Sequence, residues 1–217
     1  MNMSTVITFA ANACYGALAL VALWGAFCAI LVWRRVAEIR FRNEQEESDF
    51  LKRLDETLTE RDFEGATKLC EDDPRAVPQL VALAIANRDM GYGKVRSLLV
   101  DRFQRDVLAD LEYRVSWIYT MTKSAPMLGL YGTVLGMMGA FNQLYAGQKV
   151  DPTQLAGNIS LALATTAIGL TIAIPLIICT ASINVRIRKL EDLVGYGLTR
   201  FLESFRVAVD EGAAKRS

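Results

Sequence analysis

The sequence contains no histidine, which removes the side chain most often used as a general base and as a metal ligand. Its 24 acidic and 24 basic residues cancel, so a partner chosen by bulk charge, such as nucleic acid, is not indicated. The four cysteines show neither CxxC nor metal-like spacing, and three of them stand in apolar runs, where a thiol acts as a small apolar group. These absences predict a protein that is not an enzyme and that holds neither a metal nor a cofactor.

Long stretches of the chain also lack charge. Residues 1–33 carry no charged side chain, and between Ser124 and Val185 the only two are Lys149 and Asp151, which stand at a turn. A hydrocarbon core about 30 Å thick needs roughly 20 apolar residues of helix, and the runs on either side of that turn are both long enough. The sequence therefore predicts an all-α membrane protein with three transmembrane helices.

The positions of the basic residues predict the orientation. Cytoplasmic flanks of membrane helices are enriched in Lys and Arg, whereas the turn between the second and third runs offers only Lys149 beside Asp151. Basic residues follow the first run rather than precede it, so this run is expected to be a retained span and not a cleaved signal. Candidate interface anchors are Trp24, Trp33, Tyr131 and Tyr145, of which Trp24 and Tyr131 lie deeper in their runs. The basic flanking residues are Arg34, Arg35, Arg40, Arg42, Arg114, Lys123, Arg186, Arg188 and Lys189.

These boundaries divide the chain into six segments. The long helices are expected to extend from the membrane into a helical cytoplasmic domain. The basic flanks predict that the N-terminus faces out, and that the segment between the first two spans and the C-terminal tail lie in the cytoplasm. The segments are transmembrane helix 1 in residues 1–33, the cytoplasmic helical domain in 34–123, transmembrane helix 2 in 124–148, a periplasmic turn in 149–153, transmembrane helix 3 in 154–185, and a cytoplasmic C-terminal helix and tail in 186–217.

The segment between the first two spans has helical apolar spacing and no alternating stretch long enough for a convincing strand. Leu51, Leu54 and Leu58, for example, share one helix face. Pro74 and Pro78 are expected to interrupt the helices here, because proline removes a backbone donor and disfavours the helical turn before it.

The second half of this segment leads into the membrane. A short apolar helix is expected from Val77 to Met90. From Lys94 onward, apolar residues keep helical spacing, which predicts one long helix that runs through Lys123 into the second span and bends at Pro126.

Small residues recur at helical spacing inside the second and third spans. Such faces let two backbones approach closely and are ordinary in membrane bundles. Pro126 and, in mid-membrane, Pro175 predict helix kinks, because each frees a backbone carbonyl. The expected packing residues are Gly129, Gly132, Gly136 and Gly139 in the second span and Ala164 and Ala167 in the third, with Ala162, Gly169 and Ala173 on a neighbouring face.

Two motifs carry a resemblance to a known family. Residues 125–141 read APMLGLYGTVLGMMGAF, and residues 158–175 read NISLALATTAIGLTIAIP. The first motif is similar to the second span, and the other to the third span, of the MotA/TolQ/ExbB proton channel family. Their order and separation match as well, behind a first span and a helical segment. The chain therefore resembles an ExbB-like subunit.

The resemblance implies a ring of such subunits, five in the family, around single-span partners of the ExbD or TolR kind. The partner's membrane aspartate carries the proton, and the work is passed to the envelope, as in TonB-dependent-type transport with a TonB-like protein as a further partner. Thr133 and Thr166 match the family's paired polar positions, and together with Thr165 and Ser160 they are expected to line the proton pathway. On the residues alone, the favoured interpretation is that each threonine hydroxyl bonds back to its own helix.

The spans themselves contain no Asp, Glu, Lys, Arg or His. This chain therefore cannot relay protons through an ionisable side chain of its own, and it needs a second polypeptide that supplies one. Leu161 stands where many ExbB and TolQ members carry a glutamate, and Asn158 replaces the motif's glycine. A second ionisable relay inside the subunit is thus absent.

Several alternatives stay open at this stage. Within the family, the chain could serve TolQ-like envelope maintenance or act as a motility stator, although three spans rather than four favour the ExbB and TolQ kind. From other classes, it could be a structural membrane scaffold without proton flux, or a self-sufficient solute channel that conducts alone.

Overall fold

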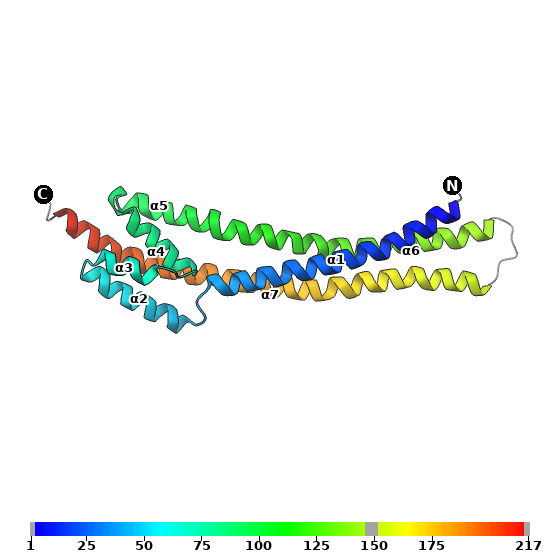
Figure 1. Cartoon of the computed structure of the whole chain (residues 1–217), viewed down its shortest axis with the longest axis horizontal. Coiled ribbons are helices and arrows are strands. Elements are labelled where there is room, and N and C mark those ends of the chain that lie inside the picture. The colour runs from blue at the N-terminus through cyan, green and yellow to red at the C-terminus, as the bar shows by residue number, and fades with distance from the viewer. Residues whose placement is uncertain (1–2, 146–151, 215–217) are drawn as a thin grey trace. The chain divides into compact units, whose positions relative to one another are not determined.

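The computed structural model describes residues 3–145 and 152–214 of the 217. Within these ranges all regular structure is helical, as the sequence predicts (Figure 1). Residues 149–151 of the predicted turn lie outside the described ranges. The elements are α1 (Met3–Ile39), α2 (Glu44–Thr59), α3 (Phe63–Cys70), α4 (Ala76–Ala86), a 3₁₀ turn (Arg88–Met90), α5 (Tyr92–Arg102), a π-helix (Phe103–Leu108), α6 (Ala109–Tyr145) and α7 (Pro152–Ala214).

The chain divides into two compact units. One, which we call the membrane unit, consists of Met1–Leu31 and Arg114–Ser182; the other, which we call the charged unit, consists of Val32–Tyr113 and Ile183–Ser217. Among the described residues, three helices are long and apolar enough to cross a membrane: α1, the continuous α5–α6 helix and α7. The prediction of an all-α protein with three membrane-crossing helices is confirmed.

In the membrane unit, parts of α1, α6 and α7 lie side by side (Figure 1). A Cβ added to Gly25 of α1 would lie 2.8 Å from Leu176 Cδ1 of α7 and 3.3 Å from Met121 Cβ of α6. A side chain at this position would require Leu176 and Met121 to shift. Other residues buried in this unit are Leu18, Ala29, Ala125, Ala140, Ala162 and Ala173.

The charged unit has an ordinary apolar core. Leu51, Leu54 and Leu58 of α2 are at most 1% exposed, so the face predicted from their spacing is the buried one. From α7, Phe201 and Phe205 are fully buried, with ring centroids 5.3 Å apart. Burial of such side chains supplies roughly 1.5–3 kcal/mol each, and it stabilises this unit.

Two expectations about α4 are wrong. Pro74 lies in the link before α4, but Pro78 lies in the first turn of α4 and does not interrupt it. The first turn has no intrahelical partner for its N–H groups, so proline costs no hydrogen bond there. The helix also stops short of Met90: Asn87 follows its last residue, and the Asn87 side chain donates to Leu83 O at 2.8 Å. A 3₁₀ turn follows, and Gly91, with φ 83°, adopts the left-handed conformation before α5.

The helix that enters the second span is continuous from Tyr92 to Tyr145, as its spacing predicts, but it contains a π-helix. A π-helix accommodates an additional residue within a helix. Here it lies between Leu99 and Leu111, which are both buried. Sequence spacing did not reveal it, because apolar residues such as Val107 and Leu108 fall at acceptable α-helical intervals.

Candidate functional site: hydroxyl groups between α6 and α7

Three threonines from two helices meet inside the membrane unit. Thr133 lies on α6, and Thr165 and Thr166 lie on α7. We call these three residues, together with the carbonyls of Gly129 and Ala162, the threonine cluster. Its position depends on how closely the two helices approach.

Glycines of α6 allow this close approach. A Cβ added to Gly129 would lie 2.8 Å from Thr165 O, and one added to Gly132 would lie 2.6 Å from Thr165 Oγ1. A Cβ at Gly136 would lie 2.6 Å from Ala162 Cβ. Larger residues at these three positions would force the helices apart, so the small face of α6 is the one turned to α7.

Hydrogen bonds of the threonine cluster run between the helices as well as along them. The hydroxyls of Thr133 and Thr166 are bonded to each other, and either can be the donor. Thr165 Oγ1 lies 2.7 Å from Ala162 O and 3.1 Å from Gly129 O. Thr166 Oγ1 also reaches Gly129 O at 3.1 Å, and Thr133 Oγ1 reaches Ala162 O at 3.1 Å. Each of the three hydroxyl protons therefore has more than one acceptor within hydrogen-bond distance.

The members of the cluster differ in exposure. Thr165 is only 3% exposed, because it lies between the two helices. Thr133 and Thr166 are half-buried, so they are the two threonines of the cluster that keep some exposed surface. Ser160 is exposed on α7 and makes no hydrogen bond to the cluster within the described residues.

The other expected packing residues have mixed positions. On α7, Gly169 lies against α6, because a Cβ there would lie 2.5 Å from Ala125 O. This residue belongs to the neighbouring small face and not to the face of Ala164 and Ala167. Of the residues in the expected set, Gly139 and Ala164 are half-buried and Ala167 is exposed.

Both prolines lie inside continuous helices. Pro126 is within α6 and half-buried, and Pro175 is within α7 and exposed. Neither ends its helix, which is common in membrane helices because neighbouring groups compensate for the missing hydrogen bond.

Helix α1 adds two polar contacts that the sequence does not signal. Cys14 Sγ donates to Leu128 O at 3.1 Å, and Tyr15 Oη donates to Leu161 O at 3.3 Å. A cysteine in an apolar run is equally well explained by simple burial, so its spacing could not identify this contact.

The chemistry that the cluster offers is hydrogen bonding. Among the residues that the structure describes, no group of three or more His, Cys, Asp or Glu could hold a metal ion. A threonine hydroxyl both donates and accepts, and it does so without carrying a charge of its own. Such groups can orient water or a carboxyl group in an apolar environment.

Comparison with known proteins decides the family. A model of the MotA/TolQ/ExbB proton channel family matches residues 84–194, just over half of the 217 residues. The chain belongs to this family. The resemblance predicted from the two motifs is thereby confirmed, and the threonine cluster lies within the matched range.

Individual relatives of the MotA/TolQ/ExbB family support the ExbB-like assignment. The chain is 33% identical over 117 residues to the putative biopolymer transport protein ExbB-like 2 of Helicobacter pylori, an alignment that covers 53% of this chain and 75% of the relative. It is 33% identical over 114 residues to the biopolymer transport protein ExbB of Aquifex aeolicus, covering 52% and 74%. It is 34% identical over 94 residues to the Tol-Pal system protein TolQ of Haemophilus influenzae, covering 43% and 41%.

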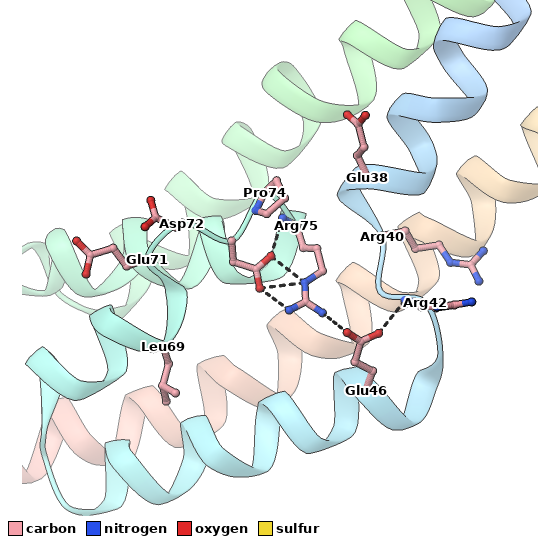
Figure 2. A pocket seen from close by; sticks show the side chains of 10 residues that line it. Glu38, Arg40, Arg42, Glu46, Leu69, Glu71, Asp72, Pro74 and Arg75 are labelled. Atoms are coloured by element: carbon pink, nitrogen blue, oxygen red, sulfur yellow. Dashed lines mark hydrogen bonds and ion pairs between the residues drawn. The ribbon is translucent and has the colours of Figure 1, made fainter.

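A second candidate site lies outside the range matched to the MotA/TolQ/ExbB family. It is a charged pocket in the charged unit, around Arg75 (Figure 2). Arg75 Nε and Nη2 donate to the carboxylate of Asp73 at 2.8 and 2.5 Å, and Nη1 donates to Glu46 Oε1 at 2.7 Å. The guanidinium also lies 4.1 Å from the ring centroid of Phe41.

In this pocket, the positive charge of Arg75 is paired with the carboxylates of Asp73 and Glu46. Burial by itself raises the pKa of Asp73, but hydrogen bonds from Arg75 and its positive charge outweigh burial and lower the pKa below its ordinary value. Burial and the charge of Asp73 also raise the pKa of the nearby Cys70 thiol to about 12, which keeps it protonated and unreactive. The pocket ties α2 to the link between α3 and α4, and its geometry is that of a structural ion-pair network.

Proposed function

We propose that this ExbB-like chain is a subunit of an inner-membrane motor driven by the proton-motive force. It forms an oligomeric ring of five around the transmembrane helices of an ExbD/TolR-like partner, with its N-terminus in the periplasm and its C-terminus in the cytoplasm. Proton flow past the partner's aspartate drives mechanical work on the envelope, such as TonB-dependent-type transport. The observation that supports this most directly is the hydrogen-bonded hydroxyl pair of the half-buried residues Thr133 and Thr166.

The hydroxyl pair suits both protonation states of a carboxyl group. A carboxylate in an apolar region needs donors, and a protonated carboxyl needs an acceptor for its O–H. The hydroxyls of Thr133 and Thr166 can act as donors to a carboxylate or as the acceptor for a protonated carboxyl. Because the spans contain no ionisable residue of the Asp, Glu, Lys, Arg or His kind, the titrating group comes from the partner.

Two energies distinguish a role of the threonine hydroxyls in proton transfer from a role in assembly of the oligomer. One charge that crosses 100 mV of membrane potential yields about 2.3 kcal/mol, whereas one interhelical hydrogen bond in a membrane contributes only about 0.6 kcal/mol. Removal of a single hydroxyl therefore leaves assembly almost unchanged. If the same variant loses most of its proton flux, the hydroxyl acts in proton transfer and not in assembly.

Thr166→Val tests the proposal. Proton uptake is measured in liposomes that contain the full chain and its ExbD/TolR-like partner under an imposed potential. Thr166→Val and Thr133→Val are each expected to abolish uptake while the oligomer, measured by native mass spectrometry, stays intact. Thr171→Val is the matched control, because Thr171 is exposed on the same helix and its hydroxyl bonds back to Ala167 O at 2.8 Å.

Other outcomes identify the alternatives. Uptake by this chain without the partner would indicate a self-sufficient channel, and no uptake with the partner would indicate a structural scaffold. Unchanged proton uptake in the Thr133→Val and Thr166→Val double variant would show that the hydroxyl pair is not part of the proton pathway. A deletion strain separates the processes within the family: loss of energised outer-membrane uptake supports ExbB-like work, whereas loss of envelope integrity or of swimming supports the TolQ-like or stator alternative.

A further inference from the structure

A tryptophan and an arginine are stacked where two membrane helices become polar. The guanidinium carbon of Arg186 on α7 lies 3.9 Å from the ring centroid of Trp33 on α1. Both residues belong to the charged unit. Trp33 is the last residue of an uncharged run, and Arg186 directly follows another. The stack therefore stands at the end of the apolar parts of both helices.

Within the described residues, no acidic side chain pairs with the positive charges of Arg34 and Arg186. In the part of the chain that the structure describes, no carboxylate oxygen lies within 4.0 Å of the charged nitrogens of Arg186 or Arg34. Arg34 is exposed, and the Trp33 side chain is 39% exposed. The neighbouring Arg35, in contrast, has Glu38 at 3.9 Å. The half-buried Arg186 on the partly exposed ring of Trp33 is thus available to an external anion, and Arg34 is the next residue in sequence after Trp33.

The geometry of the stack leaves the right atoms free for that anion. When a guanidinium lies over an aromatic face, the ring attracts its charge, while the N–H groups point outward in the guanidinium plane. That planar fork matches two oxygens of a phosphate group. The tryptophan fixes the fork and also favours the boundary between hydrocarbon and headgroups.

We propose that Trp33 and Arg186 form a binding site for the phosphate group of an anionic phospholipid, with Arg34 adding positive charge beside it. The lipid comes from the leaflet at the level where the two uncharged runs end. Its acyl chains lie along the apolar runs, and its phosphate meets the stack. This site does not depend on proton transport, and its test measures lipid contact rather than flux.

Brominated lipids can report contact with Trp33 directly. The full chain, with Trp24→Phe and Trp117→Phe so that Trp33 is the only tryptophan, is reconstituted in phosphatidylcholine vesicles. Phosphatidylglycerol or phosphatidylcholine brominated near the headgroup is then added at equal mole fractions, and quenching of Trp33 fluorescence gives the relative affinity. Phosphatidylglycerol is expected to be preferred about five-fold or more, which corresponds to one well-placed cation at the membrane surface.

Two variants with the same change of charge locate the site. Arg186→Gln is expected to remove this preference, whereas Arg188→Gln is expected to keep it within about two-fold, because Arg188 lies about 200° around the helix from Arg186. Arg186→Lys, which keeps the charge but lacks the planar fork, is expected to lose most of the preference and serves if the glutamine variant does not fold.

Three results would overturn the proposal. No preference for phosphatidylglycerol in the unaltered site would show that no anionic lipid binds there. Equal losses in Arg186→Gln and Arg188→Gln would show that general surface charge, and not the stack, attracts the lipid. Displacement of the brominated lipid by millimolar inorganic phosphate would show that the site binds free phosphate.

Discussion

Gly169 of α7 lies against the backbone of Ala125 of α6, and a Cβ at Gly169 would be 2.5 Å from Ala125 O. A backbone carbonyl cannot rotate away as a side chain can, so an added methyl group must separate the helices. Gly169→Ala is expected to destabilise the membrane unit by about 1–3 kcal/mol, more than the gain of up to about 1 kcal/mol from better helix propensity. Resistance of the purified protein to unfolding in sodium dodecyl sulfate measures the change.

Gly157→Ala is the matched control for this prediction. Gly157 is exposed on the same helix, and a Cβ there would meet nothing within 4 Å. The variant is expected to be neutral or slightly more stable than the unaltered protein. Similar losses in both variants would mean that helix contact is not the cause.

Asp55 of α2 and Arg200 of α7 are predicted to be energetically coupled. Arg200 Nη2 and Nε donate to Asp55 Oδ2 at 3.0 and 3.2 Å, and Ser204 Oγ donates to Asp55 Oδ1 at 2.8 Å. The two charged side chains are 27% and 31% exposed, so solvent screens the pair only in part. A double-mutant cycle of Asp55→Asn and Arg200→Gln is expected to give about 1 kcal/mol of coupling in the free energy of unfolding.

An exposed pair on α2 provides the reference for that cycle. Lys52 Nζ lies 3.7 Å from Asp49 Oδ1, but both side chains are more than 60% exposed. Solvent screening predicts no measurable coupling there. Urea unfolding of both sets measures the difference, and equal couplings would contradict the role assigned to partial burial.

The π-helix is predicted to correct the register of buried residues. Leu99 and Leu111 are both buried, although twelve α-helical residues would place them about 120° apart around the helix. The π-helix takes up one residue and restores an eleven-residue spacing, which is close to three helical turns. Deletion of the exposed Gln104 inside it should give an ordinary α-helix with both leucines still on one face, and thermal unfolding should change little.

Deletion of Ser97 is the contrasting variant. Ser97 is also exposed, but it lies in the α-helical part, between the buried Val95 and Leu99. Its loss rotates one of these side chains about 100° toward solvent, which should cost roughly 1.5–3 kcal/mol. Circular dichroism during heating measures both variants; if the two deletions have equal effects, register correction is not the role of the π-helix.

Acid is expected to weaken the charged unit through Asp73. Its pKa is lower in the folded protein than its ordinary value of 3.8, because Arg75 outweighs the effect of burial. The stabilisation is therefore complete above the unfolded-state pKa and is lost as the pH falls through the lower, folded-state pKa. Asp73→Asn should be less stable at pH 7 by about 1–3 kcal/mol, with the gap closing below about pH 4. Urea unfolding of both proteins between pH 7 and pH 3 measures this gap, and a gap independent of pH would exclude the ionised carboxylate as its source.

Several features could be predicted because they depend on local composition. Long runs without charge predict membrane helices, and the glycines of α6 predict the face that meets α7. The hydroxyl residues of the candidate site were also predicted, but not their division into the buried Thr165 and the half-buried pair of Thr133 and Thr166. Residues 165 and 166 are adjacent, so only the rotation of α7 against α6 decides which one is covered.

The sequence by itself determined that this protein is helical, that three helices can cross a membrane, and that it belongs to a proton channel family without charge in its spans. These properties follow from the length of the apolar runs and from the motifs, which can be recognised in the linear sequence without the three-dimensional structure. Tertiary structure alone decided the π-helix, the hydroxyl pair and the stack of Arg186 on Trp33. Each of these depends on how a helix is rotated about its axis, and that rotation is set by side chains packed from distant parts of the chain.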